Sequence, residues 1–135
     1  LFEFASPQNA KNFSFLILGA FIVLPLELKT VLLCESVVIG FVALTQSYDQ
    51  AELQNFSIHP NYQNLGYGRR LLDFAFQHLS RDVKQIFLEV RVSNFTAIRL
   101  YHNLGFEEIG NRRDYYQTEF GREDALIMTV DINGS

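Results

Sequence analysis

The sequence predicts a domain of the α/β or α+β class, in which helices cover a mixed sheet. Apolar runs rich in β-branched residues alternate along the chain with amphipathic stretches of helical periodicity. A chain of 135 residues has the size of one domain. Hydrophobic residues make up 48% of it and charged residues 19%, which excludes an intrinsically disordered protein.

The N-terminal third is the least regular part of this pattern. Ser6-Pro7 can start a helix, because Ser caps helices and Pro fits their first turn. Asn12 to Leu26 carries no charge, and we expect the helix to lead into a buried strand there. A membrane anchor is the alternative, but Pro25 interrupts the run, which is shorter than the about 20 residues of a spanning helix.

The middle of the chain contains three candidate strands. Glu27 to Cys34 and Val37 to Ser47 are predicted as strands, because both are rich in apolar and β-branched residues. Ala51 to Ile58 is the third, and Pro60 ends it because proline cannot donate a ladder hydrogen bond. We expect these strands to form one part of the sheet.

A helix, a strand and a second helix follow. The first helix is predicted from about Tyr67 to Leu79 and the strand from Gln85 to Val92. Asn94 is the expected cap of a short helix over about Phe95 to Leu104. The apolar stripe of the first helix consists of Leu71, Leu72, Ala75, Phe76 and Leu79.

Two short strands are predicted to complete the sheet. Gly105 is a helix-ending glycine, and the apolar Phe106 follows it. Phe106 to Gly110 and Asp124 to Asp131 have the composition of strands. The chain therefore ends on β structure.

Charge and cysteine content restrict the classes of partner. Eleven basic and 15 acidic residues give a net charge of −4, so we expect no direct nucleic-acid binding. The single cysteine, Cys34, excludes an internal disulfide and fits a reducing, cytoplasmic location. The three histidines are scattered without ligand spacing, so we expect no metal site and no metal cofactor.

The segment Gln63-x-x-Gly66-x-Gly68 lies between a predicted strand and a predicted helix. Glycines let the backbone approach a ligand closely, and a helix start offers N–H groups and positive partial charge. Arg69 and Arg70 add charge nearby. This arrangement predicts a phosphate-binding loop, and the alternative is an ordinary glycine-rich turn.

Glu89 and Tyr101 are candidate catalytic residues. Glu89 lies in the middle of an apolar strand, where a carboxylate is costly unless its face is wet or paired. It is either a functional carboxylate or a solvent-facing residue beside Arg91. Tyr101 shares a helix face with Ala97, Ile98 and Leu104, and its spacing favours a core tyrosine.

Several motifs together resemble the GNAT acetyltransferases. The stretch from Ile58 to Arg69 resembles the acyl-CoA-binding motif of that family, and Leu88 to Asn94 with Ala97 to Phe106 resembles its next block. Arg112 to Tyr116 and Gly121 to Met128 are similar to the tail of the bacterial ribosomal-protein-alanine N-acetyltransferases. The resemblance extends over about residues 37–132.

The resemblance implies a GNAT-like fold, a mixed and mostly antiparallel sheet flanked by helices. It implies a single domain over residues 1–135, in which residues 1–30 are atypical or truncated. Acetyl-CoA would be the co-substrate, Glu89 the base and Tyr101 the acid. The residues that the resemblance places against acetyl-CoA are Phe56, Ser57, Ile58, Gln63, Asn64, Leu65, Gly66, Tyr67, Gly68, Arg69 and Asn94.

The implied acceptor is the N-terminal Ala of a small-subunit ribosomal protein. One alternative is an acetyltransferase for another amine, a lysine or a small molecule. The other alternative is a module that binds acyl-CoA without turnover. The resemblance implies direct transfer, and Cys34 lies outside the motifs, so no acyl-enzyme is expected.

Overall fold

The computed structural model describes residues 16–133 except 19–20, 27–28 and 35–36. The helix start expected at Ser6-Pro7 lies outside the described residues. The chain forms two compact units, residues 1–45 with 55–79 and residues 46–54 with 80–135. Strands β4 (Val37–Ser47) and β5 (Gln50–Ile58) run through both units.

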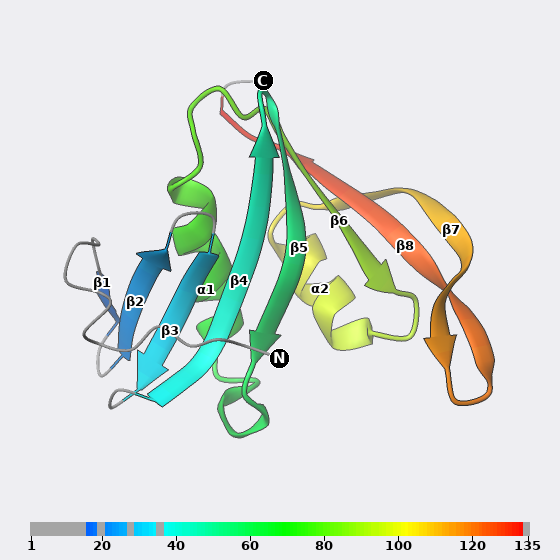
Figure 1. The fold of residues 1–135 in the computed structure, drawn as a ribbon, viewed down its shortest axis with the longest axis horizontal. Helices are drawn as coiled ribbons and strands as arrows, with labels where there is room; N and C mark the ends of the chain where they lie inside the picture. The colour runs from blue at the N-terminus through cyan, green and yellow to red at the C-terminus, as the bar shows by residue number, and fades with distance from the viewer. Residues whose placement is uncertain (1–15, 19–20, 27–28, 35–36, 134–135) are drawn as a thin grey trace. The chain divides into compact units, whose positions relative to one another are not determined.

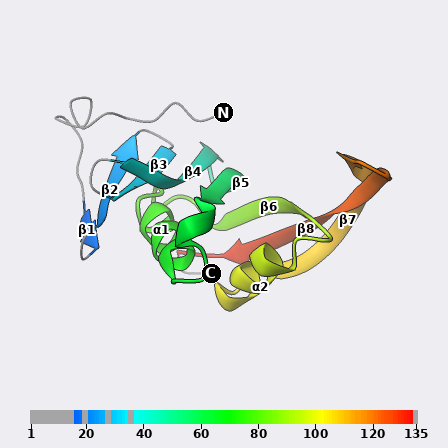
Figure 2. The ribbon, with the colours of Figure 1, turned by 90° about the horizontal axis from the view of Figure 1, so that it is seen from below.

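The first unit contains an antiparallel sheet and a helix. Its strands follow the chain in the order β1 (Leu16–Leu18), β2 (Phe21–Leu26), β3 (Lys29–Cys34) and β4 (Figure 1). The uncharged run from Asn12 to Leu26 therefore contributes strands on both sides of residues 19–20. Pro25 lies within β2, opposite Thr30 of β3. Helix α1 (Tyr67–Gln77) lies beside β3 (Figure 2).

Helix α1 buries a face that differs slightly from the prediction. Leu71, Leu72 and Ala75 are buried as expected, but Phe74 is buried in place of Phe76, which is half-buried. The buried face centres on positions i, i+3 and i+4 from Leu71, which includes residue 74. The helix ends at Gln77, so Leu79 lies beyond it and is half-buried.

The second unit contains strands in the order β5, β6 (Gln85–Arg91), β8 (Gly121–Asp131) and β7 (Glu107–Thr118). The β5–β6 pair is parallel and the other pairs are antiparallel. Helix α2 (Phe95–Asn103) lies against one face of these strands (Figure 2). The predicted class, a mixed and mostly antiparallel sheet with flanking helices, is confirmed. The core of this unit contains Ile86, Leu88, Tyr101, Phe106, Ala125 and Met128.

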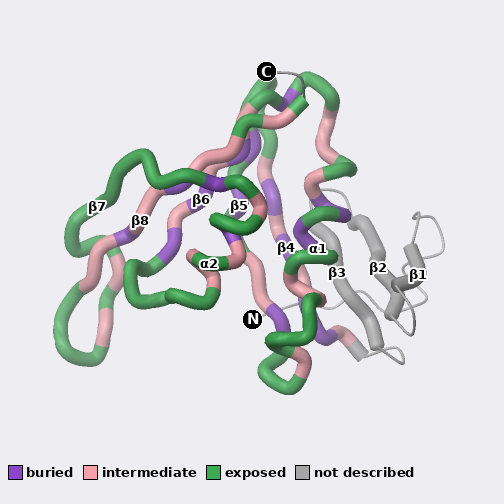
Figure 3. The backbone as a smooth tube through the Cα atoms, turned by 180° about the vertical axis from the view of Figure 1, so that it is seen from behind, coloured by how far each residue is buried: buried purple, intermediate pink, exposed green. Residues whose placement is uncertain are grey.

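The predicted boundaries at Gly110 and Asp124 were wrong, because β7 continues to Thr118 and β8 already starts at Gly121. They form a hairpin in which Thr118 pairs with Gly121. Strand β7 is exposed along most of its length (Figure 3), so it lacks the alternation of apolar residues by which a strand is recognised. At the end of β6, Val92 is 38% exposed, because the strand ends at Arg91 and the residue no longer faces the core.

Candidate active site

The predicted phosphate loop is tied to the end of β5. A 3₁₀ turn, η2 (Pro60–Tyr62), follows the strand, and the His59 amide donates to the Ile39 carbonyl of β4 at 2.6 Å. The Gln63 side chain closes the loop, since its Nε2 donates to the Ile58 carbonyl at 2.9 Å. Gln63 thus shapes the loop from within, as the first residue of the predicted motif.

The loop ends in an uncapped helix start. Gly66 is the N-cap residue of α1 with φ +85°, and Asn64 also lies in the left-handed region at φ +61°. No side chain caps the helix, and its first turn contains no acidic residue. A Cβ placed on Gly66 would meet no atom within 4 Å, so the loop is open at this point. Such a helix start favours an anion, and the exposed Arg69 adds positive charge.

The end of β5 supplies the backbone groups expected to face the reacting carbonyl. Ile58 is buried, and Phe56 and Ser57 are half-buried. Strand β4 passes very close here, because a Cβ on Gly40 would lie 3.1 Å from the Ser57 carbonyl oxygen and 2.6 Å from Ile58 Cδ1. Glycine at position 40 therefore permits the tight packing that fixes this stretch of β5.

Glu89 lies on β6 in the second unit, and its side chain forms an ion pair with a residue of β7. Its side chain is 20% exposed, and its Oε1 lies 3.0 Å from Arg112 Nε. The Tyr116 hydroxyl donates to the Glu89 carbonyl oxygen at 3.5 Å. Arg91, which the alternative places near Glu89, forms its ion pair elsewhere, with its Nη1 3.7 Å from Glu123 Oε2. Glu89 is a half-buried carboxylate with a cationic partner.

Tyr101 occupies the core position that its spacing predicted. It is 6% exposed, and its ring lies 5.8 Å from the ring of Phe106, centroid to centroid. Burial, with a smaller contribution from Tyr116, raises the pKa of Tyr101 to about 12. The phenol is therefore protonated at neutral pH, as a proton donor must be.

Asn94 caps α2 as predicted. Its Oδ1 accepts a hydrogen bond from the Ala97 amide at 3.2 Å, and its side chain is exposed. The cap explains why the chain turns into a helix directly after β6. A contact between Asn94 and acetyl-CoA stays a prediction.

Arg112 and Tyr116 both contact Glu89, and neither contact was predicted from the sequence. They belong to the part of β7 beyond Gly110, which was not predicted as a strand. The available signal was the neighbouring pair Tyr115-Tyr116, because aromatic residues favour strands. The ring of Tyr116 also lies under the Arg91 guanidinium, 4.6 Å from its Cζ.

The structure thus groups the candidate residues into two sets. The first unit contains the loop and the end of β5, and the second contains Glu89, Tyr101 and Asn94.

Among the described residues, no three His, Cys, Asp or Glu side chains gather where they could bind a metal ion. Within that same part of the chain, no helix combines the length and the apolar character needed to cross a membrane.

Within the first unit, a strand, a glycine-containing loop and an uncapped helix start form the kind of arrangement that binds a phosphate group. The acetyltransferase (GNAT) family matches residues 9–106, and the chain belongs to that family.

Individual relatives are more specific. The chain is 48% identical over 93 residues to the [ribosomal protein bS18]-alanine N-acetyltransferase of Escherichia coli strain K12, covering 67% of this chain and 63% of the relative. The Haemophilus influenzae enzyme of the same name is 41% identical over 93 residues, with the same coverage. The chain therefore spans less than two thirds of the length of these curated relatives.

Solved structures agree with the fold. The ribosomal-protein-S18-alanine N-acetyltransferase from Escherichia coli superposes with a TM-score of 0.75 at 38% identity, covering 87% of this chain and 72% of that one. An acetyltransferase of the GNAT family from Streptococcus pneumoniae gives 0.70 at 25% identity, covering 84% and 68%. The GNAT fold expected from the sequence is confirmed.

Proposed function

We propose that the protein is an N-acetyltransferase that moves acetyl from acetyl-CoA to the α-amino group of an N-terminal Ala on a small-subunit ribosomal protein. The observation that carries the acceptor is the 48% identity to an enzyme named for alanine of ribosomal protein bS18. The observation that supports the acetyl donor is the open, uncapped start of α1 within a chain of the GNAT family.

Acetyl-CoA is bound as a substrate by the loop. The pyrophosphate takes the helix start at Gly66, because N–H groups and positive partial charge gather there. The residues that would contact it are the end of β5 and the loop, together with Asn94, as follows: Phe56, Ser57, Ile58, Gln63, Asn64, Leu65, Gly66, Tyr67, Gly68, Arg69 and Asn94.

The transfer is direct. An α-amine has a pKa of about 8, so most of it is protonated at neutral pH and must lose a proton before it attacks. Glu89 accepts that proton, directly or through a water. The amine nitrogen bonds to the thioester carbon, and peptide N–H groups at Phe56–Ile58 stabilise the oxyanion. The C–S bond then breaks, and Tyr101 donates its proton to the leaving thiolate. The second proton that the attacking nitrogen loses as the amide forms restores the Tyr101 phenol through solvent.

The test is acetylation of purified protein substrates and peptides. The protein is incubated with acetyl-CoA and with peptides that start with Ala, contain an internal lysine, or have a blocked N-terminus. Mass spectrometry then locates the added acetyl group, which we expect on the α-amine of Ala alone. Acetylation of lysine would overturn the proposed acceptor. Binding of acetyl-CoA with no release of CoA in the presence of any of these peptides would overturn the enzymatic function.

A substitution of the base tests the mechanism. Glu89→Gln keeps the size of the side chain but removes the proton acceptor, so we expect kcat to fall by about 10²-fold or more. Glu52→Gln is the matched control, because Glu52 is exposed on the neighbouring strand β5. Full activity of Glu89→Gln at neutral pH would contradict the assigned base.

A further inference from the structure

The charged run at the start of β8 bonds to neighbouring segments of its own unit. Arg122 Nη1 donates to the Asp114 carbonyl at 3.2 Å, and Asp124 Oδ1 accepts from the Asp114 amide at 2.9 Å. Glu123 Oε1 accepts from the Ser93 hydroxyl at 2.7 Å and from the Ser93 amide at 3.1 Å. The side chains of Arg122, Glu123 and Asp124 therefore all have partners within the fold. Those of Arg122 and Asp124 both bond to Asp114 of β7.

That residue lies at the centre of a bulge. Between Arg112 and Tyr116 strand β7 advances four residues while its partner advances two, from Ala125 to Glu123. Asp114 has φ +54°, a left-handed conformation that most L-residues disfavour, although Asp tolerates it better than most. Both the amide and the carbonyl of Asp114 are held by the side chains at 124 and 122, so the bulge is fixed from β8.

The two residues that flank the bulge both contact Glu89. Arg112 lies before it and pairs with the carboxylate at 3.0 Å, while Tyr116 lies after it and bonds to the Glu89 carbonyl at 3.5 Å. Because neighbouring residues of a strand face opposite sides, a slip of one residue in β7 would turn Arg112 away from Glu89. The shape of the bulge therefore decides which side chains reach the candidate base.

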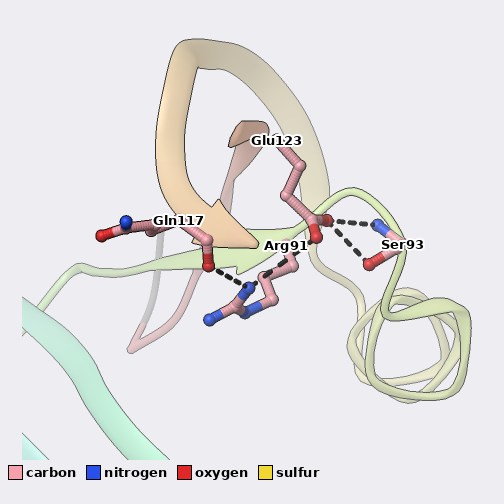
Figure 4. Close-up of polar contacts among 4 residues, drawn as sticks. All are labelled: Arg91, Ser93, Gln117 and Glu123. Atoms are coloured by element: carbon pink, nitrogen blue, oxygen red, sulfur yellow. Dashed lines mark hydrogen bonds and ion pairs between the residues drawn. The ribbon is translucent and has the colours of Figure 1, made fainter. Parts of the chain in front are cut away.

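Glu123 is connected to β7 through Arg91 of β6. Figure 4 shows that it pairs with Arg91 and that the Arg91 guanidinium donates to the Gln117 carbonyl. The donor and acceptor atoms of that hydrogen bond lie 3.4 Å apart. The same guanidinium lies over the Tyr116 ring. Tyr116 is therefore held in place by the contact of its ring with Arg91 as well as by the bulge.

We propose that Arg122 and Asp124 are positioning residues, a bulge clamp, which holds Asp114 so that Arg112 and Tyr116 stay on Glu89. The clamp acts through its two hydrogen bonds to the Asp114 backbone. The inference rests on the proposed function, because Glu89 must be the base for its position to matter in turnover.

Asp124→Ala tests the clamp. It frees the Asp114 amide and lets the bulge relax, and a misplacement of about 1 Å can cost up to about 10²-fold in rate. We expect kcat for an Ala-starting peptide to fall by about 10–10²-fold, with the KM for acetyl-CoA unchanged. Asp131→Ala is the matched control, because Asp131 lies on the same strand and its Oδ1 accepts from Gln85 Nε2 at 3.0 Å. It should keep the kcat of the wild type.

A rescue variant separates positioning from general stability. Glycine adopts a positive φ without strain, so Asp114→Gly in the Asp124→Ala background should keep the bulge without the clamp. We expect this double variant to recover most of the lost kcat. Hydrogen exchange should also show faster exchange of the amides at 112–116 in Asp124→Ala than in Asp131→Ala.

Each outcome decides the inference. An Asp124→Ala enzyme with wild-type kcat, an equal loss in Asp131→Ala, or a double variant as slow as Asp124→Ala would overturn the clamp while the wild type still acetylates the peptide. A wild-type protein that acetylates no amine would instead overturn the proposed function, and the inference with it.

Discussion

Tyr101 shows how one side chain can meet two requirements. Its ring belongs to the core beside Phe106, and burial keeps its hydroxyl protonated well above neutral pH. A core role and a proton-donor role therefore do not exclude each other. The spacing of residues on α2 could predict only the first of these, because the periodicity of a helix reports burial and not the fate of a hydroxyl group.

Tyr101→Phe separates the two roles. The ring and its packing against Phe106 remain, so the fold should be retained, while the proton donor is lost. We expect kcat to fall by about 10²-fold, as is typical for loss of an acid catalyst. Single-turnover kinetics with acetyl-CoA and an Ala-starting peptide measure the loss. Tyr48→Phe is the control, since Tyr48 is 88% exposed in a turn. Equal rates for Tyr101→Phe and the wild type at neutral pH would exclude Tyr101 as the acid.

The partner of Glu89 could not be predicted from nearby sequence. Glu89 itself stands out in the sequence, because a carboxylate within an apolar strand is unusual. Its cation, Arg112, is 23 residues further along the chain and reaches it only through the pairing of β7 with β8 and of β8 with β6. Arg91 was the nearest arginine in sequence but bonds to Glu123 instead. A contact that depends on the register of two strand pairs leaves no signal in the residues next to Glu89 in the sequence.

At the scale of elements, the predicted helices and central strands match the structure closely. β4 spans the predicted residues, β5 starts one residue early, and α2 ends one residue early. Their apolar periodicity is strong because one face of each packs into a core. The hairpin of β7 and β8 was only partly predicted, because β7 is mostly exposed and its bulge breaks the alternation.

The loop before α1 was predictable because its signal is contiguous. Gly66 has φ +85° with open space around the missing Cβ, so a substitution there alters conformation without a clash. Gly66→Ala should destabilise the protein by about 1 kcal/mol and weaken acetyl-CoA binding, because alanine disfavours this conformation. Gly66→Asn is the matched variant, since asparagine tolerates positive φ and should bind more tightly than Gly66→Ala. Calorimetry measures both affinities, and equal binding by the two variants would contradict a role for the left-handed turn.

For the whole molecule, the pH dependence of stability reports the charged contacts of β8. Hydrogen bonds from the Ser93 side chain, then from its amide, lower the pKa of Glu123 below its ordinary value of 4.5, and Arg91 lowers it further. The stabilisation is therefore fully present above about pH 4.5 and is lost as the pH falls through the lowered value.

Glu123→Gln tests this contribution on the acidic side. The variant should be less stable than the wild type at neutral pH, and the gap should close as the wild-type carboxylate becomes protonated. Urea denaturation at several values from about pH 7 to about pH 3 measures the gap. A gap of constant size over that range would show that the carboxylate's charge contributes nothing to folding.

The alkaline side of the same stability profile belongs to Tyr101. Its pKa in the folded protein is about 12, against an ordinary value of 10.0, because burial disfavours the phenolate. The folded protein therefore holds this proton more strongly than the unfolded chain, so the contribution is complete below pH 10 and is lost as the pH rises toward 12. A shift of about two pKa units corresponds to about 3 kcal/mol.

Tyr101→Phe has no proton to lose, so its free energy of unfolding should decline less steeply above about pH 10 than that of the wild type. The decline should not vanish, because burial, followed by the charge of Glu89, also raises the pKa of Tyr116. Parallel declines of the two proteins in urea denaturation would mean that the Tyr101 phenolate is accommodated in the fold.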